Sequence, residues 1–211
     1  MDTSKTAALR QRLGGEAPGV LWARGDLSLL NTPAVALVGS RDLRPPNEAF
    51  AKEVGEQAAR QGFVLISGNA RGADRTAQDS CLAAGGQVIS VVADALSEKT
   101  EQENVLYLSE EDYDQAFSAQ RALRRNRVIH ALGEVTLVAQ SDLGIGGTWS
   151  GTTTTVNNAF NNNARVSYMN ATTLTAGSDF KLGSLWVYWT WIKDQNGIDR
   201  HVLASANDGR S

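Results

Sequence analysis

Residues 65–74 read LISGNARGAD, and the fold can be worked out from this stretch. An apolar run at 63–67 ends in a glycine-containing loop, and a helix-forming segment starts at Ala73. A short, continuous apolar run is typical of a strand buried on both faces of a parallel sheet. The stretch therefore predicts a strand, a loop and a helix. The loop is either a plain turn or a place where backbone meets a phosphate.

The same unit repeats along the chain on both sides of this stretch. Continuous apolar runs predict strands at 35–40, 63–67, 87–94, 105–110, 135–141 and 165–170. Helix-forming segments with terminating glycines predict helices at 45–60, 73–84 and 114–132. Strands that alternate with helices indicate an α/β fold, a Rossmann-like open parallel sheet with helices on both faces.

Residues 171–211 lack this alternation. Asn196-Gly197 stands between two β-prone runs, SLWVYWTWIK and HVLASA, which is a strong hairpin signal. We therefore expect an N-terminal segment at 1–16, a Rossmann-like domain at 17–170 and a C-terminal β-hairpin appendage at 171–211. The alternative for the last segment is two edge strands added to the main sheet.

Composition limits the possible functions. The chain has 211 residues and a net charge of −3, so any nucleic-acid surface has to be a local patch. No apolar run reaches the roughly 18 residues of a membrane span, and the N-terminus lacks a signal-peptide core. We expect a cytoplasmic protein without a membrane partner. Cys81 is the single cysteine, and no His or Cys cluster has metal spacing, so no metal or cofactor is expected.

Two loops that follow neighbouring strands contain both glycine and arginine. Gly39-Ser40-Arg41 follows the first predicted strand, and Arg71-Gly72 follows the second. Glycine lets backbone N–H groups approach a phosphate closely, and arginine offers a bidentate fork. Because ligands of open α/β sheets bind beyond the carboxyl ends of the strands, the loops predict an anion site. The alternatives are a solvated Arg41, and an Arg71 that pairs with Asp74.

Two further segments are candidates for the same site. The segment QRALRRNRVIHAL carries Arg121, Arg124 and Arg125 on one helical face, and its alternative reading is a solvated face. His130, in its apolar part, is interpreted as a core residue rather than a base. The stretch GIGGTWSGT at 144–152 is typical of a phosphate nest, although it has no P-loop lysine.

Together these segments resemble the DNA-processing protein A family, abbreviated DprA and also called Smf. The matching pieces are GVLWARGDLSLLNTPAVALVGSR, LISGNARGADRTAQDSCLAAGGQVISVV, LYLSE, RRNRVIHAL, VTLVAQS and GGTWSGT. They occur in the family's order. The resemblance implies a Rossmann-like fold of the superfamily that also contains LOG-type phosphoribohydrolases. It further implies binding of single-stranded DNA in natural transformation, delivery of that DNA to the RecA-type recombinase, and a homodimer.

The resemblance also implies a pocket for phosphate and DNA. Its residues would be Gly39, Ser40, Arg41, Ser67, Gly68, Arg71, Gly72, Asp74, Arg125, Asn126, Arg127, Gly147, Thr148, Gly151 and Thr152. Asp74 is interpreted as a group that orients the helix start rather than a catalytic carboxylate. The chain departs from the family pattern at Ala73 and Gln78, where isoleucine and histidine are common.

Two other functions stay open. GGTWSGT resembles the PGGxGT loop of the phosphoribohydrolases, which place a catalytic glutamate just after it. Here the positions after Gly151 are threonines and a valine, so we expect no enzyme. The alternative is a nucleotide-binding or nucleotide-hydrolysing protein. A third possibility is a nucleotide-sensing module whose tail contacts a partner.

Overall fold

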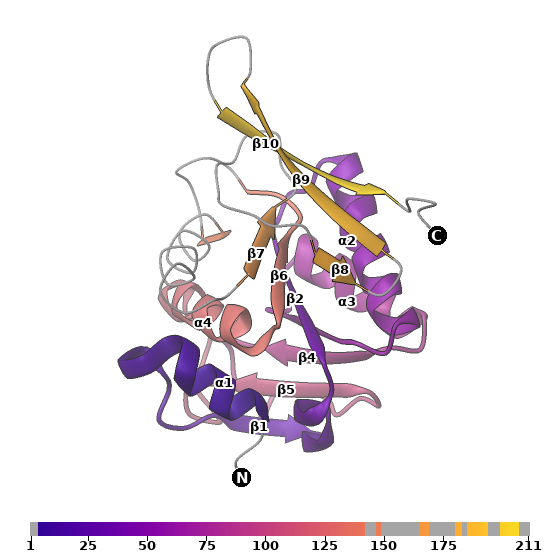
Figure 1. Cartoon of the computed structure of the whole chain (residues 1–211). Coiled ribbons are helices and arrows are strands. Elements are labelled where there is room, and N and C mark those ends of the chain that lie inside the picture. Colours follow the sequence, from indigo (N-terminus) through magenta and orange to yellow (C-terminus); the bar gives the residue numbers. More distant parts are fainter. Residues whose placement is uncertain are drawn as a thin grey trace.

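The computed structural model describes residues 4–141, 147–148, 165–168, 180–182, 185–193 and 199–206. Its main element is a seven-stranded sheet with helices on both faces (Figure 1). The strands are β1 (Trp22–Gly25), β2 (Ala34–Val38), β3 (Val64–Ser67), β4 (Gln87–Val91), β5 (Val105–Ser109), β6 (Val135–Val138) and β7 (Arg165–Tyr168). The helices around them are α1 (Ser4–Leu13), α2 (Pro45–Arg60), α3 (Ala73–Ala83) and α4 (Ala119–Leu132).

The strands lie in the order β1-β5-β4-β3-β2-β6-β7. All neighbouring strands pair in parallel except β1, which is antiparallel to β5 at one edge. The prediction of a Rossmann-like open sheet is therefore confirmed. The chain runs from β2 outward to β5 and then returns to place β6 on the other side of β2. The strand order thus reverses between β2 and β6.

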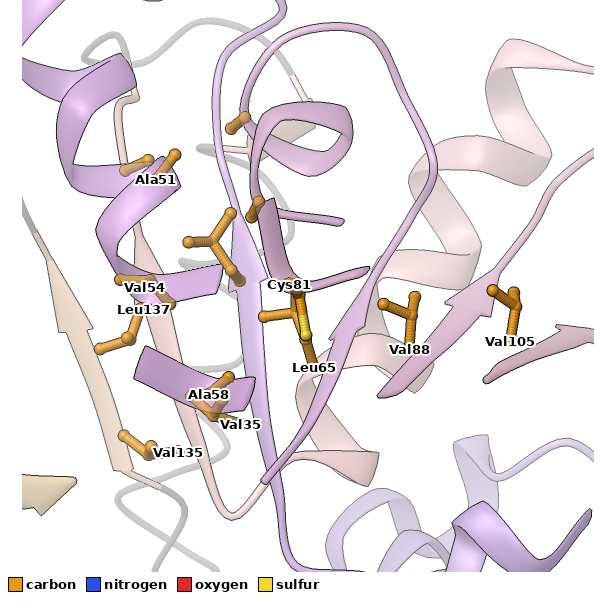
Figure 2. Packing of buried hydrophobic residues seen from close by; sticks show 14 of the residues in the cluster. Val35, Ala51, Val54, Ala58, Leu65, Cys81, Val88, Val105, Val135 and Leu137 are labelled. Carbon is orange, nitrogen blue, oxygen red and sulfur yellow. The ribbon is translucent and has the colours of Figure 1, made fainter. Parts of the chain in front are cut away.

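Two hydrophobic clusters fix the helices to the two faces of the sheet. On one face, α2 and α3 cover the central strands, and Figure 2 shows Val54 and Ala58 of α2 and Cys81 of α3 packed over strand residues such as Val35 and Leu65. On the other face lie α1, α4 and two 3-10 helices, η1 (Gly14–Glu16) and η2 (Leu27–Asn31). None of the helices among the described residues is long and apolar enough to cross a membrane.

The structure corrects several predicted element bounds. The strands expected at 35–40, 87–94 and 135–141 end at Val38, Val91 and Val138, and the helix expected at 114–132 begins only at Ala119. The carbonyl of Tyr113 accepts hydrogen bonds from the N–H groups of Leu96 and Ser97, which holds the preceding segment as a loop. Ser118 then has an extended backbone, with φ −142° and ψ 137°. Residues 114–118 have a composition that favours a helix, but the tertiary hydrogen bonds of Tyr113 and the extended backbone of Ser118 delay the helix to Ala119.

His130 is a core residue, as the sequence indicates. Its ring is buried, and Nδ1 lies 3.2 Å from the hydroxyl of Thr136 at the start of β6. Burial lowers the pKa of His130 to about 4, so the ring is neutral at physiological pH.

The C-terminal part contains a second, three-stranded sheet of order β10-β9-β8 (Figure 1). Its strands are β8 (Phe180–Leu182), β9 (Leu185–Lys193) and β10 (Asp199–Ala206). The antiparallel pairing of β9 with β10 confirms the predicted hairpin. The alternative of edge strands on the main sheet is wrong, because these strands form their own sheet. The turn at Asn196-Gly197 lies outside the described residues.

Close packing of α2 on α3 depends on a glycine. A Cβ placed on Gly55 would lie 2.2 Å from the carbonyl oxygen of Ala77. We expect Gly55→Ala to lower the free energy of unfolding by about 1–3 kcal/mol, since the helices would have to move apart. Urea unfolding measures this change.

Helix propensity alone predicts the opposite sign, a gain of about 1 kcal/mol. Gly19→Ala is a control for the added methyl group outside a helix, because apart from its chain neighbours no atom lies within 4 Å of that group. A Gly55→Ala protein as stable as the parent would contradict the described packing.

Candidate functional site

A cavity of about 400 Å³ lies at the carboxyl ends of β2 and β6, where the strand order reverses. Open α/β sheets bind their ligands at such a switch point. The cavity is lined by residues from both strand ends, from α3 and from α4: Val38, Gly39, Ser40, Arg41, Ala70, Asp74, Ala119, Ala122, Leu123, Arg125, Asn126, Ser141, Gly147 and Thr148. We call it the first cavity.

A second cavity of about 490 Å³ adjoins it at the ends of β3 and β4. The two share Arg41, Ala70, Ala122 and Arg125 as lining residues. The second cavity is completed by Gly68, Asn69, Arg71, Ala93, Asp94 and Phe117. The sequence-predicted loops after β2 and β3 therefore do meet at one edge of the sheet.

The loop after β2 is fixed by its own hydrogen bonds and by Gln140. The N–H of Ser40 donates to the Gln140 carbonyl at 2.8 Å, and the Ser40 hydroxyl accepts from the N–H of Asp42 at 3.2 Å. The Gln140 side chain accepts from the N–H of Arg44 at 2.9 Å and donates to the Asp42 carbonyl at 3.0 Å. Sequence reasoning missed Gln140, although a polar residue directly after a buried strand was a signal.

Arg41 stands on this fixed loop with its side chain exposed. It lines both cavities and has no hydrogen-bond or ion-pair partner among the residues that the structure describes. Within the described part of the chain, Arg41 is thus an exposed cation without a hydrogen-bonded partner at the junction of the two cavities.

The loop after β3 is held by Asp74. The Asp74 carboxylate accepts hydrogen bonds from the N–H groups of Gly68 at 3.0 Å and Ala70 at 3.3 Å. Burial raises the pKa of Asp74, while the nearby Arg125 guanidinium and the two N–H groups oppose this rise. The carboxylate orients the loop from the first turn of α3, which fits the interpretation of Asp74 as an orienting group.

The two loops also contact each other. The N–H of Ala73 donates to the Ser40 carbonyl at 3.1 Å. Gly72 adopts φ +84°, and a Cβ there would lie 2.4 Å from the same Ser40 carbonyl oxygen. Only glycine permits this backbone angle and this close approach together.

Arg125 is buried beneath both cavities. Its guanidinium donates to the carbonyls of Gly68, at 2.5 Å, and Val91, and its Nε donates to Ala122 at 3.2 Å. Burial lowers the pKa of Arg125, and the nearby carboxylates of Asp74 and Asp94 act in the opposite direction. The sequence placed Arg125 on a common face with Arg121 and Arg124, whereas the structure buries it and binds its N–H groups to backbone.

Other predicted residues also lie beside or below the cavities. Ser67 is fully buried, and its hydroxyl accepts from Nε2 of Gln78 at 2.5 Å. Arg71 is exposed and pairs with Asp42 at 2.7 Å, rather than with Asp74. Arg127 lines neither cavity, because its guanidinium bonds to Glu110 at 2.5 Å.

The segment after β6 reaches the first cavity. The hydroxyl of Thr148 donates to the Gly39 carbonyl at 3.0 Å, and the amide of Asn126 donates to the Gly147 carbonyl at 3.3 Å. Three predicted members of the site are therefore close together here: Asn126, Gly147 and Thr148. Gly151 and Thr152, the other two residues predicted for the site from this glycine-rich stretch, lie outside the described residues.

Two apolar side chains at the cavities were not predicted. Phe117 is 58% exposed and lines the second cavity, and Leu123 is 50% exposed and lines the first. Asp94 also lines the second cavity and was missed. Phe117 could not be placed from sequence because its segment reads as part of a helix.

Arg125 gives a direct stability prediction. We expect Arg125→Ala to lower the free energy of unfolding by about 3–5 kcal/mol, since it leaves buried carbonyls without donors and Asp74 without its charge partner. Arg124→Ala is the matched control, because it removes the same charge from the adjacent, exposed position. Equal unfolding midpoints for the two variants in urea would contradict the structural role of Arg125.

Comparison with known proteins identifies the family. The family model described as DNA recombination-mediator protein A matches residues 6–180. The chain is 27% identical over 136 residues to the DNA processing protein DprA of Bacillus subtilis, covering 59% of this chain and 46% of that protein. The chain spans less than half the length of the curated relatives it matches.

Two solved structures share the fold. The structure of DNA processing protein A from Streptococcus pneumoniae has a TM-score of 0.66 and 26% identity, covering 82% of this chain and 61% of that one. The Helicobacter pylori protein, described for its single-stranded DNA binding mode, has a TM-score of 0.65 and 25% identity, covering 81% and 78%. By its sequence and its fold, the chain belongs to the DNA recombination-mediator protein A family.

Proposed function

We propose that this protein binds single-stranded DNA at the carboxyl edge of its sheet and acts as a recombination mediator rather than as an enzyme. The observation that carries the proposal is Arg41, an exposed cation at the junction of two adjoining cavities that has no hydrogen-bond or ion-pair partner among the described residues. Membership of the family supports the proposal, as does the single-stranded DNA binding described for the Helicobacter pylori relative.

The charges at the site suit a phosphate backbone. Arg41 and Arg71 are both exposed, and the ion pair of Arg71 with Asp42 is exposed as well, with side-chain exposures of 75% and 85%. An exposed pair of this kind contributes only about 0–1 kcal/mol, so a DNA phosphate can replace Asp42 at little cost. The whole chain carries a net charge of −3, so attraction of a phosphate backbone depends on these exposed arginines rather than on the charge of the whole chain.

The predicted site residues take two proposed roles. One group is proposed to contact the strand through side chains or backbone: Gly39, Ser40, Arg41, Arg71, Gly72, Asn126, Gly147, Thr148, Gly151 and Thr152. The other group is proposed to hold the surrounding backbone in place: Ser67, Gly68, Asp74, Arg125 and Arg127. Fixed backbone donors beside an exposed arginine form an anion site that needs little reorganisation on binding.

The acidic group at the first cavity supports binding over catalysis. Asp74 is 6% exposed, and its Oδ2 accepts the two backbone hydrogen bonds that hold the loop after β3, which supports an orienting role for this carboxylate.

A nucleotide is the second candidate ligand. The first cavity, about 400 Å³, falls within the range of small-molecule sites, roughly 300–1,000 Å³. An assay for free base released from nucleoside monophosphates decides whether the protein hydrolyses such a ligand. Clear turnover would replace the mediator role with an enzymatic one.

The wider role follows from the family. We infer delivery of the bound strand to a RecA-type recombinase, a homodimer as the working unit, and action in the cytoplasm, where such a recombinase operates. Co-sedimentation of the protein with RecA on single-stranded DNA tests the first of these inferences.

Replacing both exposed arginines tests the site. We expect Arg41→Ala combined with Arg71→Ala to weaken binding of a labelled single-stranded oligomer about tenfold or more, because charge-assisted hydrogen bonds contribute about 1.5–3 kcal/mol each. The dependence of affinity on salt should also become shallower, as fewer counterions are released. Fluorescence anisotropy across a salt series measures both changes.

One matched double variant controls for net charge, and a further variant tests the pair of Arg71 with Asp42. Lys52→Ala with Arg60→Ala removes the same charge from exposed positions on α2 and should leave binding nearly unchanged. Asp42→Asn releases Arg71 and should strengthen binding. If the arginine double variant binds as tightly as the parent, the site assignment is wrong.

A further inference from the structure

The second cavity differs from the first in its chemistry. Beside Arg41 and Arg71 it holds a carboxylate, Asp94, and a largely exposed aromatic ring, Phe117. A carboxylate repels a phosphate, so the part of the cavity near Asp94 does not suit the DNA backbone. An acceptor together with an aromatic surface suits a nucleobase.

Asp94 has one carboxylate oxygen available for a ligand. Its Oδ2 accepts a hydrogen bond from Nζ of Lys99 at 2.5 Å. Its Oδ1 accepts none from the residues that the structure describes, and the side chain is 34% exposed. The pair with Lys99 thus holds the carboxylate in place after the end of β4 and leaves Oδ1 as an acceptor on a residue that lines the second cavity.

Phe117 supplies an apolar surface at the same cavity. Its side chain is 58% exposed, although burying a phenylalanine ring is favourable. Stacking on an aromatic ring is tolerant of sequence because every base has a π-face. Phe117 therefore contributes affinity for any base, whereas Asp94 distinguishes between bases.

We propose that the second cavity is a nucleobase subsite that selects bases with an exocyclic amino group, with Asp94 as the acceptor and Phe117 as the stacking surface. A carboxylate accepts from the 4-amino group of cytosine. Thymine and uracil present a carbonyl oxygen at that position, which the carboxylate repels. The inference rests on the proposed binding of single-stranded DNA and adds a base preference to it.

The test compares two oligomers that differ in this group. Single strands of deoxycytidine and deoxyuridine of equal length carry the same charge. Fluorescence anisotropy with the full chain, at slightly alkaline pH where deoxycytidine strands do not pair with each other, gives the ratio of their dissociation constants. We expect about fivefold tighter binding of the deoxycytidine strand, the lower end of discrimination by base-edge hydrogen bonds.

Variants assign the preference to its residues. Asp94→Asn should bring the ratio close to one, because the amide can also donate to the uracil carbonyl. The ratio is insensitive to the accompanying charge change, which acts on both strands alike. Lys99→Gln keeps the carboxylate and should keep the preference. Phe117→Ala should weaken the binding of both strands by similar factors. The loss of affinity should be larger than for Phe117→Leu.

The outcomes separate this inference from the proposed function. Tight but equal binding of the two strands overturns the base preference and leaves single-stranded DNA binding intact. An unchanged ratio in Asp94→Asn overturns the role of Asp94. Unchanged affinity in Phe117→Ala overturns the stacking surface, and failure of the parent to bind either strand overturns both proposals.

Discussion

The buried guanidinium of Arg125 holds the candidate site together. It reaches from α4 to the carbonyls at the ends of β3 and β4, and it lies beside the Asp74 carboxylate that orders the loop after β3. A buried cation is tolerated only when its donors are satisfied and a counter-charge is near. Nε and Nη1 of Arg125 donate to three carbonyls, and Asp74 and Asp94 lie near as counter-charges, which ties α4 to the backbone at the floor of the two cavities. The loops above it can then present backbone groups in fixed positions.

The exposed arginines have a different role from the buried Arg125, since they present positive charge to a ligand. Arg41 and Arg71 carry charge into solvent from loops whose backbones are already bonded. Because these loops are already ordered, anion binding costs little conformational entropy of the backbone. A smaller part of the electrostatic attraction is therefore lost to this cost. This division explains how a chain of negative net charge can still offer a site for a polyanion. The electrostatic field of these arginines acts over a short range, and added salt screens it.

Much of the fold was predictable because buried parallel strands have a strong apolar signal. The glycine loops after β2 and β3 were also placed correctly, since their position at the sheet edge follows from strand direction. The roles of the arginines on α4 were not predictable. Helical periodicity puts Arg121, Arg124 and Arg125 on one face, but it cannot show that one of them finds carbonyls across the sheet edge. The exposed position of Phe117 was not predictable either, because its segment has a helical composition and only tertiary hydrogen bonds keep it in a loop.

The account is tested most directly by amide hydrogen exchange with and without a single-stranded oligodeoxynucleotide. It predicts that bound DNA slows exchange in the loop 39–44 and at residues 69–72, while the C-terminal hairpin of β9 and β10 is unaffected. These loops bear the proposed phosphate contacts, and bound DNA excludes water from their backbone. Slower exchange confined to the hairpin, with both loops unchanged, would contradict the claim that the carboxyl edge of the sheet is the DNA site.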